Sequence, residues 1–294
     1  MKQQTIIIIG ATSGIGKTLF EKYAADGNRI GIVGRRTHLL DELRQEHPDM
    51  TVTATADITK QDEIVRAIDS LRVELKDIDL AIVCSGTGDI NASLDFTVER
   101  PTIDTNVIGW TFVIDTLYQI FEQQGHGHLV AITSAGGLRG EPMAPAYSAS
   151  KAYQINYMEA LRKKAYKSCS HIHVTDIRPG LVDTAMAKGE GLFWVMPVEK
   201  VANQIIAAIR KEKSKAYITK RWHVLAVIIK SLPFMFYKRM YDAMDHLKME
   251  LRHWTQADAM ELTSLCNAVD RRFLSDRLPN PYTEKDAEEW LKSF

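Results

Sequence analysis

Near its amino terminus the chain reads Thr5-Ile-Ile-Ile-Ile-Gly-Ala-Thr-Ser-Gly-Ile-Gly16. The β-branched run predicts a short strand buried on both faces, and the glycines after it predict a tight turn into a helix. A plain strand-to-helix turn is one interpretation. Placement after the first strand favours a dinucleotide site, because glycines let backbone N–H groups and the positive helix end approach a pyrophosphate. The residues of this turn expected to contact the dinucleotide are Gly10, Thr12, Ser13, Gly14, Ile15 and Gly16.

Short β-branched runs then alternate with longer helical patterns through most of the chain. The runs predict strands near residues 5–9, 29–33, 51–56, 78–83, 128–133, 171–177 and 216–219, with helices near 15–26, 37–47, 61–76, 98–123, 149–167 and 197–211. Such alternation is typical of βαβ units around a parallel sheet. We therefore predict an α/β fold, a doubly wound parallel sheet of the Rossmann type, with a helical extension at its C-terminal end.

The alternation stops near residue 220, which predicts three parts: a Rossmann nucleotide-binding domain at 1–220, an apolar and basic helical extension at 221–248, and a short helical tail at 249–294. Within the extension, the apolar stretch Trp222–Phe236 is shorter than the roughly 20 residues of a bilayer span. Its apolar residues recur at helical spacing between basic flanks. This pattern predicts either peripheral contact with an anionic membrane surface, or a helix that covers a pocket or a second copy of the chain.

Composition excludes several classes of function. Lys plus Arg and Asp plus Glu both total 37, so no overall charge attracts nucleic acid. The cysteines Cys84, Cys169 and Cys266 have neither a pairing pattern nor metal-ligand spacing, which predicts a reducing compartment and no metal site. The apolar run at the amino terminus is too short for a signal peptide, so we expect a cytoplasmic protein, with peripheral contact at the inner face of the membrane as an open alternative.

A second motif, Ala146-Tyr-Ser-Ala-Ser-Lys151, carries the chemistry. Tyr147 and Lys151 are four residues apart, so on a helix they share one face. The ammonium group would favour the phenolate and bring the phenol pKa nearer to working pH. Together with the glycine turn and Ser134 at a strand end, this pair predicts an enzyme that couples hydride transfer to proton transfer.

The spacing Gly-x-x-x-Gly-x-Gly, with Ser134, Tyr147 and Lys151, resembles the short-chain dehydrogenase/reductase family over about residues 5–220. The resemblance implies that Tyr147 is the general acid/base, that Lys151 holds the nicotinamide ribose and lowers the Tyr147 pKa, and that Ser134 bonds the substrate oxygen. Thr133 is the alternative to Ser134. The stretch Asn106-Val-Ile-Gly matches a family pattern whose asparagine holds a water in the proton path. The implied catalytic set is Asn106, Ser134, Tyr147 and Lys151.

The resemblance also implies further cofactor contacts. The stretch Arg178-Pro-Gly-Leu-Val-Asp-Thr184 resembles the family's Pro-Gly turn at the nicotinamide end, and Asp57 matches an acidic residue that touches adenine. A helix N-terminal cap is the alternative for Asp57. Cys84 stands where relatives carry an asparagine. This departure puts the affinity for the cofactor in doubt before it puts the catalytic chemistry in doubt. The implied contacts outside the first turn are Asp57, Ile58, Gly86, Asn106, Tyr147, Lys151, Pro179, Gly180, Val182 and Thr184.

Cofactor preference is set at the end of the second strand, where the chain reads Gly34-Arg35-Arg36. NAD enzymes place a carboxylate there, and NADP enzymes place a basic group on the 2′-phosphate. A solvated helix start is the alternative for Arg35 and Arg36, but arginines in a first turn oppose the helix dipole unless an anion is bound. We therefore expect NADP(H), with NAD(H) remaining open.

The loops at about residues 136–145 and 183–198 should form the substrate side. Their apolar character predicts a lipophilic ketone or its alcohol as substrate, or a lid that packs on the core. The apolar residues are Leu138, Met143, Met186, Leu192, Phe193, Trp194, Val195 and Met196. The predicted function is an NADP(H)-dependent carbonyl reductase that forms a homodimer or homotetramer by analogy with the family. The alternatives are a catalytically weak NADP(H) sensor or scaffold and a membrane-surface lipid-binding protein.

The last 46 or so residues look like the opening segment of a GNAT-type acetyltransferase. The glycine-rich loop that would hold acetyl-CoA is absent from the sequence, so acetyl transfer is not expected from this chain alone. A truncated fusion and a chance helical hairpin both remain open. The spacings Thr255 to Asp258 and Thr283 to Asp286 are typical of helix N-terminal caps and predict two short helices.

Overall fold

The protein is described here by a computed structural model, which covers residues 3–168, 171–185, 195–219, 222, 226, 230, 231, 233–238, 258–268 and 281–291. The chain divides into two compact units, Met1–Leu232 and Pro233–Phe294. The first unit contains the sheet and all of the predicted site residues.

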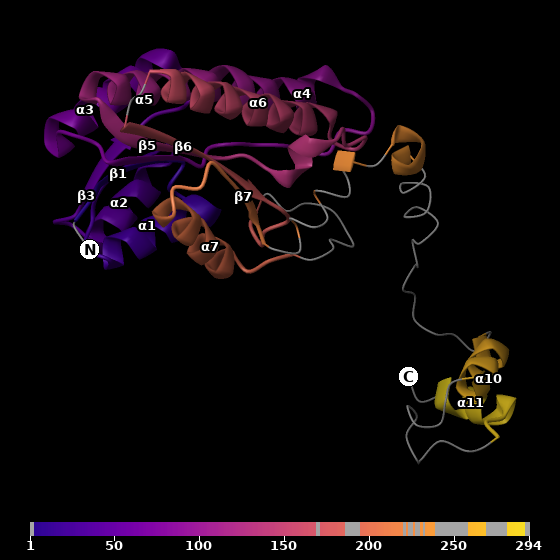
Figure 1. Cartoon of the computed structure of the whole chain (residues 1–294). Coiled ribbons are helices and arrows are strands. Elements are labelled where there is room, and N and C mark those ends of the chain that lie inside the picture. Colours follow the sequence, from indigo (N-terminus) through magenta and orange to yellow (C-terminus); the bar gives the residue numbers. More distant parts are fainter. Residues whose placement is uncertain are drawn as a thin grey trace. The chain divides into compact units, whose positions relative to one another are not determined.

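Parallel strands form one seven-stranded sheet in the first unit, in the order β3-β2-β1-β4-β5-β6-β7 (Figure 1). The strands are β1 (Thr5–Ile9), β2 (Arg29–Gly34), β3 (Thr51–Thr55), β4 (Leu80–Val83), β5 (His126–Ile132), β6 (His171–Pro179) and β7 (Lys215–Ile218). The strand order reverses at β1, between β2 and β4, and α/β sheets bind ligands at the carboxyl ends of strands at such a switch point. The predicted doubly wound parallel sheet is therefore confirmed.

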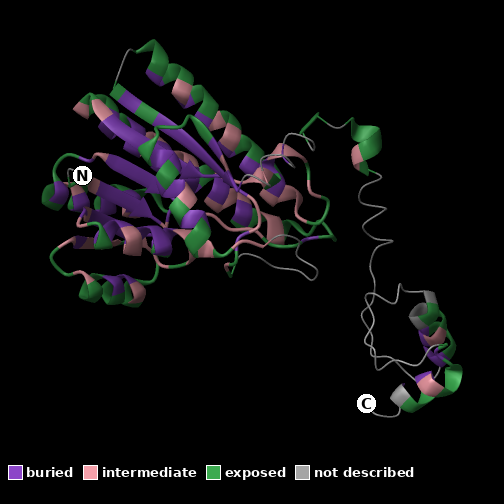
Figure 2. Cartoon of the chain, turned by 60° about the horizontal axis from the view of Figure 1, so that its bottom comes forward, coloured by how far each residue is buried: buried purple, intermediate pink, exposed green. Residues whose placement is uncertain are grey.

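Helices cover both faces of the sheet. On one face lie α1 (Gly14–Ala25), α2 (Thr37–Glu46) and α7 (Val198–Arg210), and on the other lie α3 (Gln61–Leu75), α5 (Trp110–Gln124) and α6 (Pro145–Lys167) (Figure 1). The central strand shows why two layers are needed. Ile6 and Ile8 pack toward the first group of helices and Ile7 and Ile9 toward the second, and all are fully buried. Buried residues accordingly concentrate in the strands and on the inner helix faces (Figure 2).

The helix predicted at 98–123 is interrupted. The structure has α4 (Phe96–Ile103), then a π-helical turn, η1 (Asp104–Gly109), and then α5. Within this region the Trp110 N–H bonds the Thr105 carbonyl, five residues back. A π-turn inserts one residue into the helical register, and such turns are frequent at functional sites. Asn106 lies inside this turn.

The helix that carries Tyr147 begins at Pro145, earlier than the predicted start near 149. Proline suits the first helical position because its missing N–H would have no intrahelical partner there. The carboxylate of Glu99, on α4, accepts a hydrogen bond of 2.9 Å from the Ala146 N–H. Tyr147 therefore sits in the first turn of α6, and a neighbouring helix caps that turn.

Between residues 221 and 248 the described residues are 222, 226, 230, 231 and 233–238. Among the helical residues described, no helix combines the length and apolar character that crossing a membrane requires. Phe234, Met235 and Phe236 are exposed. The rest of the apolar and basic extension at 221–248 lies largely outside the described residues, and its contact with a membrane surface remains a prediction.

Among the described residues of the second unit, α10 (Ala259–Ala268) and α11 (Glu284–Leu291) contribute to a small apolar cluster. Asn267 ties the segment before α11 to α10: its side chain bonds both the Tyr282 carbonyl, at 2.7 Å, and the Tyr282 N–H, at 2.9 Å. Asp286 accepts from the Thr283 N–H at 2.8 Å and the Thr283 hydroxyl accepts from the Asp286 N–H at 3.3 Å. This reciprocal pair confirms the predicted cap at Thr283, whereas Thr255 lies outside the described residues.

A buried histidine in the sheet predicts how stability depends on pH. The His128 ring on β5 is 2.7 Å from the Thr175 hydroxyl, which donates its proton to the Lys213 carbonyl, also at 2.7 Å. The His128 Nε2 therefore carries the proton that it donates to Thr175. Burial lowers the pKa of His128 to about 4, and the neighbouring His173 adds to this shift.

We expect acid to destabilise the fold through His128. As pH falls from about 6.5 toward 4, the unfolded chain binds a proton at this residue and the folded chain does not, so stability decreases. At pH 4.5 the loss should be about 2 to 3 kcal/mol. Urea unfolding at pH 7 and 4.5 should show a clearly smaller loss in His128→Gln than in the wild type or in the exposed control His171→Gln. Equal losses in all three would contradict this account.

Candidate active site

The glycine turn after β1 is held by close backbone contacts. Gly10 and Gly14 have φ of +88° and +51°, in the region that favours glycine. A Cβ on Gly16 would lie 2.1 Å from the Gly10 carbonyl oxygen, so the start of α1 packs directly on the turn. Ser13 is the N-cap residue of α1, which leaves the first N–H groups of the helix directed at the turn. This geometry suits the pyrophosphate site that the sequence predicted.

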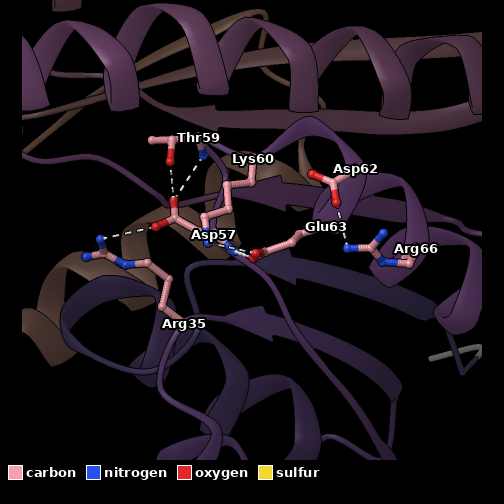
Figure 3. A network of polar contacts seen from close by, with 7 residues as sticks. All are labelled: Arg35, Asp57, Thr59, Lys60, Asp62, Glu63 and Arg66. Atoms are coloured by element: carbon pink, nitrogen blue, oxygen red, sulfur yellow. Dashed lines mark hydrogen bonds and ion pairs between the residues drawn. The ribbon is translucent and has the colours of Figure 1, made fainter.

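Both arginines after β2 are exposed at the edge of this turn. Arg36 donates to the Thr12 hydroxyl at 2.7 Å, which links the second strand end to the glycine turn. The side chain of Arg35 is 73% exposed and lies 3.7 Å from the Asp57 carboxylate (Figure 3). Gly34 packs on Thr12, whose methyl carbon would be 2.9 Å from an added Cβ. Two guanidinium groups therefore lie beside the turn: Arg36 is hydrogen-bonded to Thr12, and Arg35 makes one long contact with Asp57.

Asp57 follows β3 and is held by its own loop. Its carboxylate accepts from the Thr59 N–H at 3.0 Å and the Thr59 hydroxyl at 2.9 Å (Figure 3). Partial burial raises the Asp57 pKa, but the Thr59 bonds and the charges of Arg35 and Lys60 outweigh it and lower the pKa overall. The N-cap of α3 is Lys60, so the helix-cap alternative for Asp57 does not hold. The next residue, Ile58, is buried, and its carbonyl packs against Gly109.

The loop after β4 connects the glycine turn to the proton-transfer residues. A Cβ on Gly10 would lie 2.8 Å from the backbone and hydroxyl of Ser85, and one on Gly86 would lie 3.3 Å from the Lys151 Nζ. Cys84 lies in this loop with a free thiol, and burial raises its pKa to about 12. Cys84 is therefore a neutral thiol at physiological pH, at the position where the family resemblance implied an asparagine.

Tyr147 and Ser134 meet at the carboxyl edge of β5. Ser134 caps η2 (Ala135–Leu138) by accepting from the Gly136 N–H at 3.0 Å. Burial raises the pKa of Tyr147, and a hydrogen bond from Ser134 lowers it by less. The net direction differs from the lowered pKa that the family resemblance implied, because desolvation dominates in this structure. A raised pKa keeps the phenol protonated, as a proton donor must be.

Lys151 is completely enclosed one turn further along α6. Its Nζ lies 5.8 Å from the centre of the Tyr147 ring, donates to Gln154 at 2.9 Å, and donates to the Ile132 carbonyl at 3.3 Å. Burial lowers the Lys151 pKa to about 8, against the opposing effects of Asp176 and Cys84. The pKa of Lys151 is therefore well below that of an exposed lysine.

Asn106 is buried and bonded on every side by neighbours. Its side chain accepts from the Thr87 N–H at 2.8 Å and donates to the Thr87 carbonyl at 2.7 Å and to the Ser150 hydroxyl at 3.0 Å. Its backbone carbonyl accepts from the side chain of Gln154 at 2.9 Å. Gln154 therefore connects Asn106 to Lys151, a role that the sequence analysis missed.

Thr133, the alternative to Ser134, bonds a residue of β6. Its buried hydroxyl donates to the Asp176 carboxylate at 2.6 Å, which turns it toward β6. Asp176 also pairs with Arg178 through two contacts of 2.6 and 2.7 Å, and Arg178 bonds the Tyr217 hydroxyl at 2.8 Å. This buried ion pair lies directly before Pro179 and was not predicted. Of the two hydroxyls, Ser134 is the one beside Tyr147.

The segment after β6 folds back toward the glycine turn. Gly180 donates to the Ile218 carbonyl at 2.9 Å, and Trp222 packs on it so closely that a Cβ would overlap the indole. Val182 is buried and bridges to Met196. The Thr184 methyl carbon lies 3.1 Å from where a Gly14 Cβ would be. The segment after β6, which is predicted to contact the nicotinamide end of a dinucleotide, therefore lies beside the glycine turn, which is predicted to contact the pyrophosphate.

The substrate-side loops are described in part. Leu138, Val195 and Met196 are half-buried and Met143 is exposed, whereas Met186, Leu192, Phe193 and Trp194 lie outside the described residues. Among the residues that the structure describes, no three His, Cys, Asp or Glu side chains are grouped so as to hold a metal ion.

Comparison with known proteins agrees with this geometry. The family described as short chain dehydrogenase matches residues 4–192. The chain is 32% identical over 226 residues to an uncharacterized oxidoreductase of Mycobacterium tuberculosis, covering 74% of this chain and 88% of that protein. A short chain dehydrogenase of Burkholderia cenocepacia in complex with NADP has a TM-score of 0.70 at 20% identity, covering 81% and 97% of the two chains.

A structure of actinorhodin polyketide ketoreductase with NADPH has the same fold, with a TM-score of 0.66 at 21% identity, covering 74% of this chain and 95% of that one. Because the family match spans well over half of the chain and a relative above 30% identity is aligned over most of it, the chain belongs to the short-chain dehydrogenase family of oxidoreductases.

Proposed function

We propose that the protein is an NADP(H)-dependent carbonyl reductase that acts on a lipophilic ketone. The observation that carries the proposal is the meeting of Ser134, Tyr147 and Lys151 beside the glycine turn, at the carboxyl edge of a doubly wound sheet. The experiment is to follow nicotinamide absorbance while the purified protein is mixed with NADPH and apolar ketones. Oxidation of NADPH that depends on the ketone and on Tyr147 would support the proposal.

The residues present fit a dinucleotide. Gly10 and Gly14 adopt positive φ, and the closeness of Gly16 to the Gly10 carbonyl leaves no volume for a side chain between turn and helix. We propose that Thr12, Ser13 and Ile15 line the same cradle, with Asp57 and Ile58 toward the adenine and Pro179, Gly180, Val182 and Thr184 toward the nicotinamide. The bound nicotinamide would supply or accept the hydride. Relatives of the same fold bind NADP and NADPH, which supports this assignment.

The preference for NADP(H) rests on Arg35 and Arg36. Both are exposed beside the turn, and no carboxylate follows β2 directly in the sequence. The Arg35 contact with Asp57 is long, at 3.7 Å, and exposed ion pairs of this kind contribute little. A dianionic phosphate would therefore compete well for the same guanidinium group.

Replacing Arg35 and Arg36 together with alanine should weaken NADPH binding by at least about a hundredfold and change NADH binding little, because charge-assisted hydrogen bonds contribute about 1.5 to 3 kcal/mol each. Nicotinamide fluorescence titrations measure both affinities. Arg66→Ala is the matched control, since Arg66 is also exposed but pairs with Asp62 on α3 (Figure 3). Equal weakening of NADPH and NADH binding would contradict the proposal that Arg35 and Arg36 bind the 2′-phosphate.

The proton step is assigned to residues of α6 and β5. Tyr147 donates its proton to the substrate oxygen, and the Ser134 hydroxyl beside it holds that oxygen. Burial keeps Tyr147 protonated, which suits reduction better than oxidation. Lys151, when charged, stabilises the phenolate that remains, and Asn106 anchors the interface between η1 and α6.

The lipophilic substrate is proposed from the loops around this centre. Leu138 and Met143 follow β5, Val195 and Met196 precede α7, and Trp222 covers Gly180. Apolar walls around a small number of polar groups suit a hydrophobic carbonyl compound. We further propose assembly as a homodimer or homotetramer, as the family resemblance implied. No described residue favours a sensor or scaffold over an enzyme.

A further inference from the structure

Gln154, on α6, contacts two residues of the predicted catalytic set, and the proposed reaction gives it no role. It lies three residues after Lys151 and is fully buried. Its side-chain carbonyl accepts from the Lys151 Nζ at 2.9 Å, and its amide nitrogen donates to the Asn106 backbone carbonyl at 2.9 Å. Both polar ends of the carboxamide are therefore occupied, and each partner belongs to the predicted catalytic set.

Asn106 cannot easily move away from this contact. Its side chain is bonded to Thr87 and Ser150, and Ser150 in turn donates to the Tyr147 carbonyl at 2.7 Å. The backbone at Asn106 lies in the π-helical turn η1, where the regular helical ladder changes register. Gln154 thus bridges a fixed carbonyl and a buried ammonium group.

The ammonium group needs such a partner because its surroundings oppose its charge. Burial lowers the Lys151 pKa to about 8, and the raising effects come from Asp176 on β6 and Cys84 after β4. Asp176 is already paired with Arg178, and Cys84 is a neutral thiol. The other group that faces Lys151 is Tyr147, whose pKa is raised by burial. A hydrogen bond accepted by a carbonyl oxygen favours the charged amine.

We propose that Gln154 is a positioning residue, whose carboxamide holds Lys151 in its charged state and fixes it to the Asn106 carbonyl. The inference rests on the proposed function, because the reaction gives Lys151 its role. The family resemblance implied that Asn106 holds a water in the proton path, and in the structure the Asn106 backbone carbonyl accepts a hydrogen bond from Gln154. A chain of waters relays a proton because each water accepts one proton as it passes another on, which a carboxamide does not readily do. The bridge therefore holds Lys151 and does not relay protons to it.

The test is an NMR titration of lysine side chains in the full chain, with the Lys151 signal assigned by its loss in Lys151→Arg. Wild type should show this signal titrating near pH 8. Gln154→Met keeps the volume but removes the strong acceptor, so the midpoint should fall by about half to one pH unit. Gln154→Glu places a carboxylate beside the ammonium group, so the midpoint should rise by about one to three units.

The pH dependence of kcat supplies the second readout. If charged Lys151 supports the proton step, the alkaline decline of kcat should move with the NMR midpoint, in opposite directions in the two variants. Tyr153→Phe is the control on the same helix, because the Tyr153 hydroxyl bonds Thr111 at 2.9 Å and leaves Lys151 untouched. It should change neither readout.

Two results would overturn the inference: a Lys151 midpoint that stays in place in the Gln154 variants, or a midpoint that moves while the kcat profile does not. If Gln154→Glu does not fold, Gln154→Met decides the question alone. The NMR readout needs no turnover. A wild type that turns over no ketone would identify a failure of the proposed function, whereas normal turnover with an unmoved midpoint would identify a failure of this inference.

Discussion

Replacing Tyr147 with phenylalanine should lower kcat by about a thousandfold and leave NADPH affinity within about threefold of wild type. Positioned general acids contribute about 10² to 10⁴ in rate, and we propose that the phenol is the group that donates the proton here. The substitution keeps the ring, which packs against Gly88 and Gly136, and removes the hydroxyl that bonds Ser134. Stopped-flow measurement of NADPH oxidation and a fluorescence titration separate the two effects.

Tyr153→Phe and Tyr157→Phe provide controls for Tyr147→Phe. Both hydroxyls lie on α6 and bond α5, through Thr111 and Asp115, away from Ser134. Loss of one such bond should cost stability of about 1 kcal/mol and little activity. Turnover by Tyr147→Phe at the rate of these controls would contradict the assignment of Tyr147 as the acid.

Replacing Gly16 with alanine should abolish tight cofactor binding, with a loss of at least about a hundredfold. The added Cβ would lie 2.1 Å from the Gly10 oxygen and 3.0 Å from its carbonyl carbon. These are backbone atoms, so relief requires α1 to move away from the turn, and with it the N–H groups that we propose bind the pyrophosphate. Overpacking of this kind also costs about 1 to 3 kcal/mol of folding stability.

Gly140→Ala is the matched control for Gly16→Ala, because nothing lies within 4 Å of the position that its Cβ would take. Isothermal titration with NADPH and urea unfolding should show both losses in Gly16→Ala and neither in Gly140→Ala. An undiminished affinity in folded Gly16→Ala would show that the turn does not hold the cofactor as proposed.

The sheet was predictable because its central strands are buried on both faces and read as short apolar runs rich in β-branched residues. Ile6 to Ile9 show this most clearly, since the residues alternate between the two helix layers. The glycine turn and the pair Tyr147 and Lys151 were predictable for a related reason: their spacing is local, and a strand-to-helix turn or one helical turn brings the members together.

The π-helical turn at Asp104–Gly109 was not predictable, because a one-residue change in helical register leaves the apolar pattern almost unchanged. Gln154 was missed because a polar residue within a helix usually faces solvent, and only the packing of η1 on α6 buries it. The pair Asp176 and Arg178 was missed because the sequence of a strand does not show which charged residues in it are buried or which groups they contact. The burial of Gln154, and the contacts of the Asp176–Arg178 pair with Thr133 and Tyr217, depend on tertiary contacts between segments distant in sequence.

The most direct test of the central claim is transfer of deuterium from NADPH labelled at both C4 positions to an apolar ketone, with mass spectrometry of the alcohol formed. We predict deuterium on the carbinol carbon with the wild type, and a yield lower by about a thousandfold with Tyr147→Phe. Alcohol without deuterium, or equal yields from the two proteins, would contradict the proposal that this site performs hydride transfer with Tyr147 as its acid.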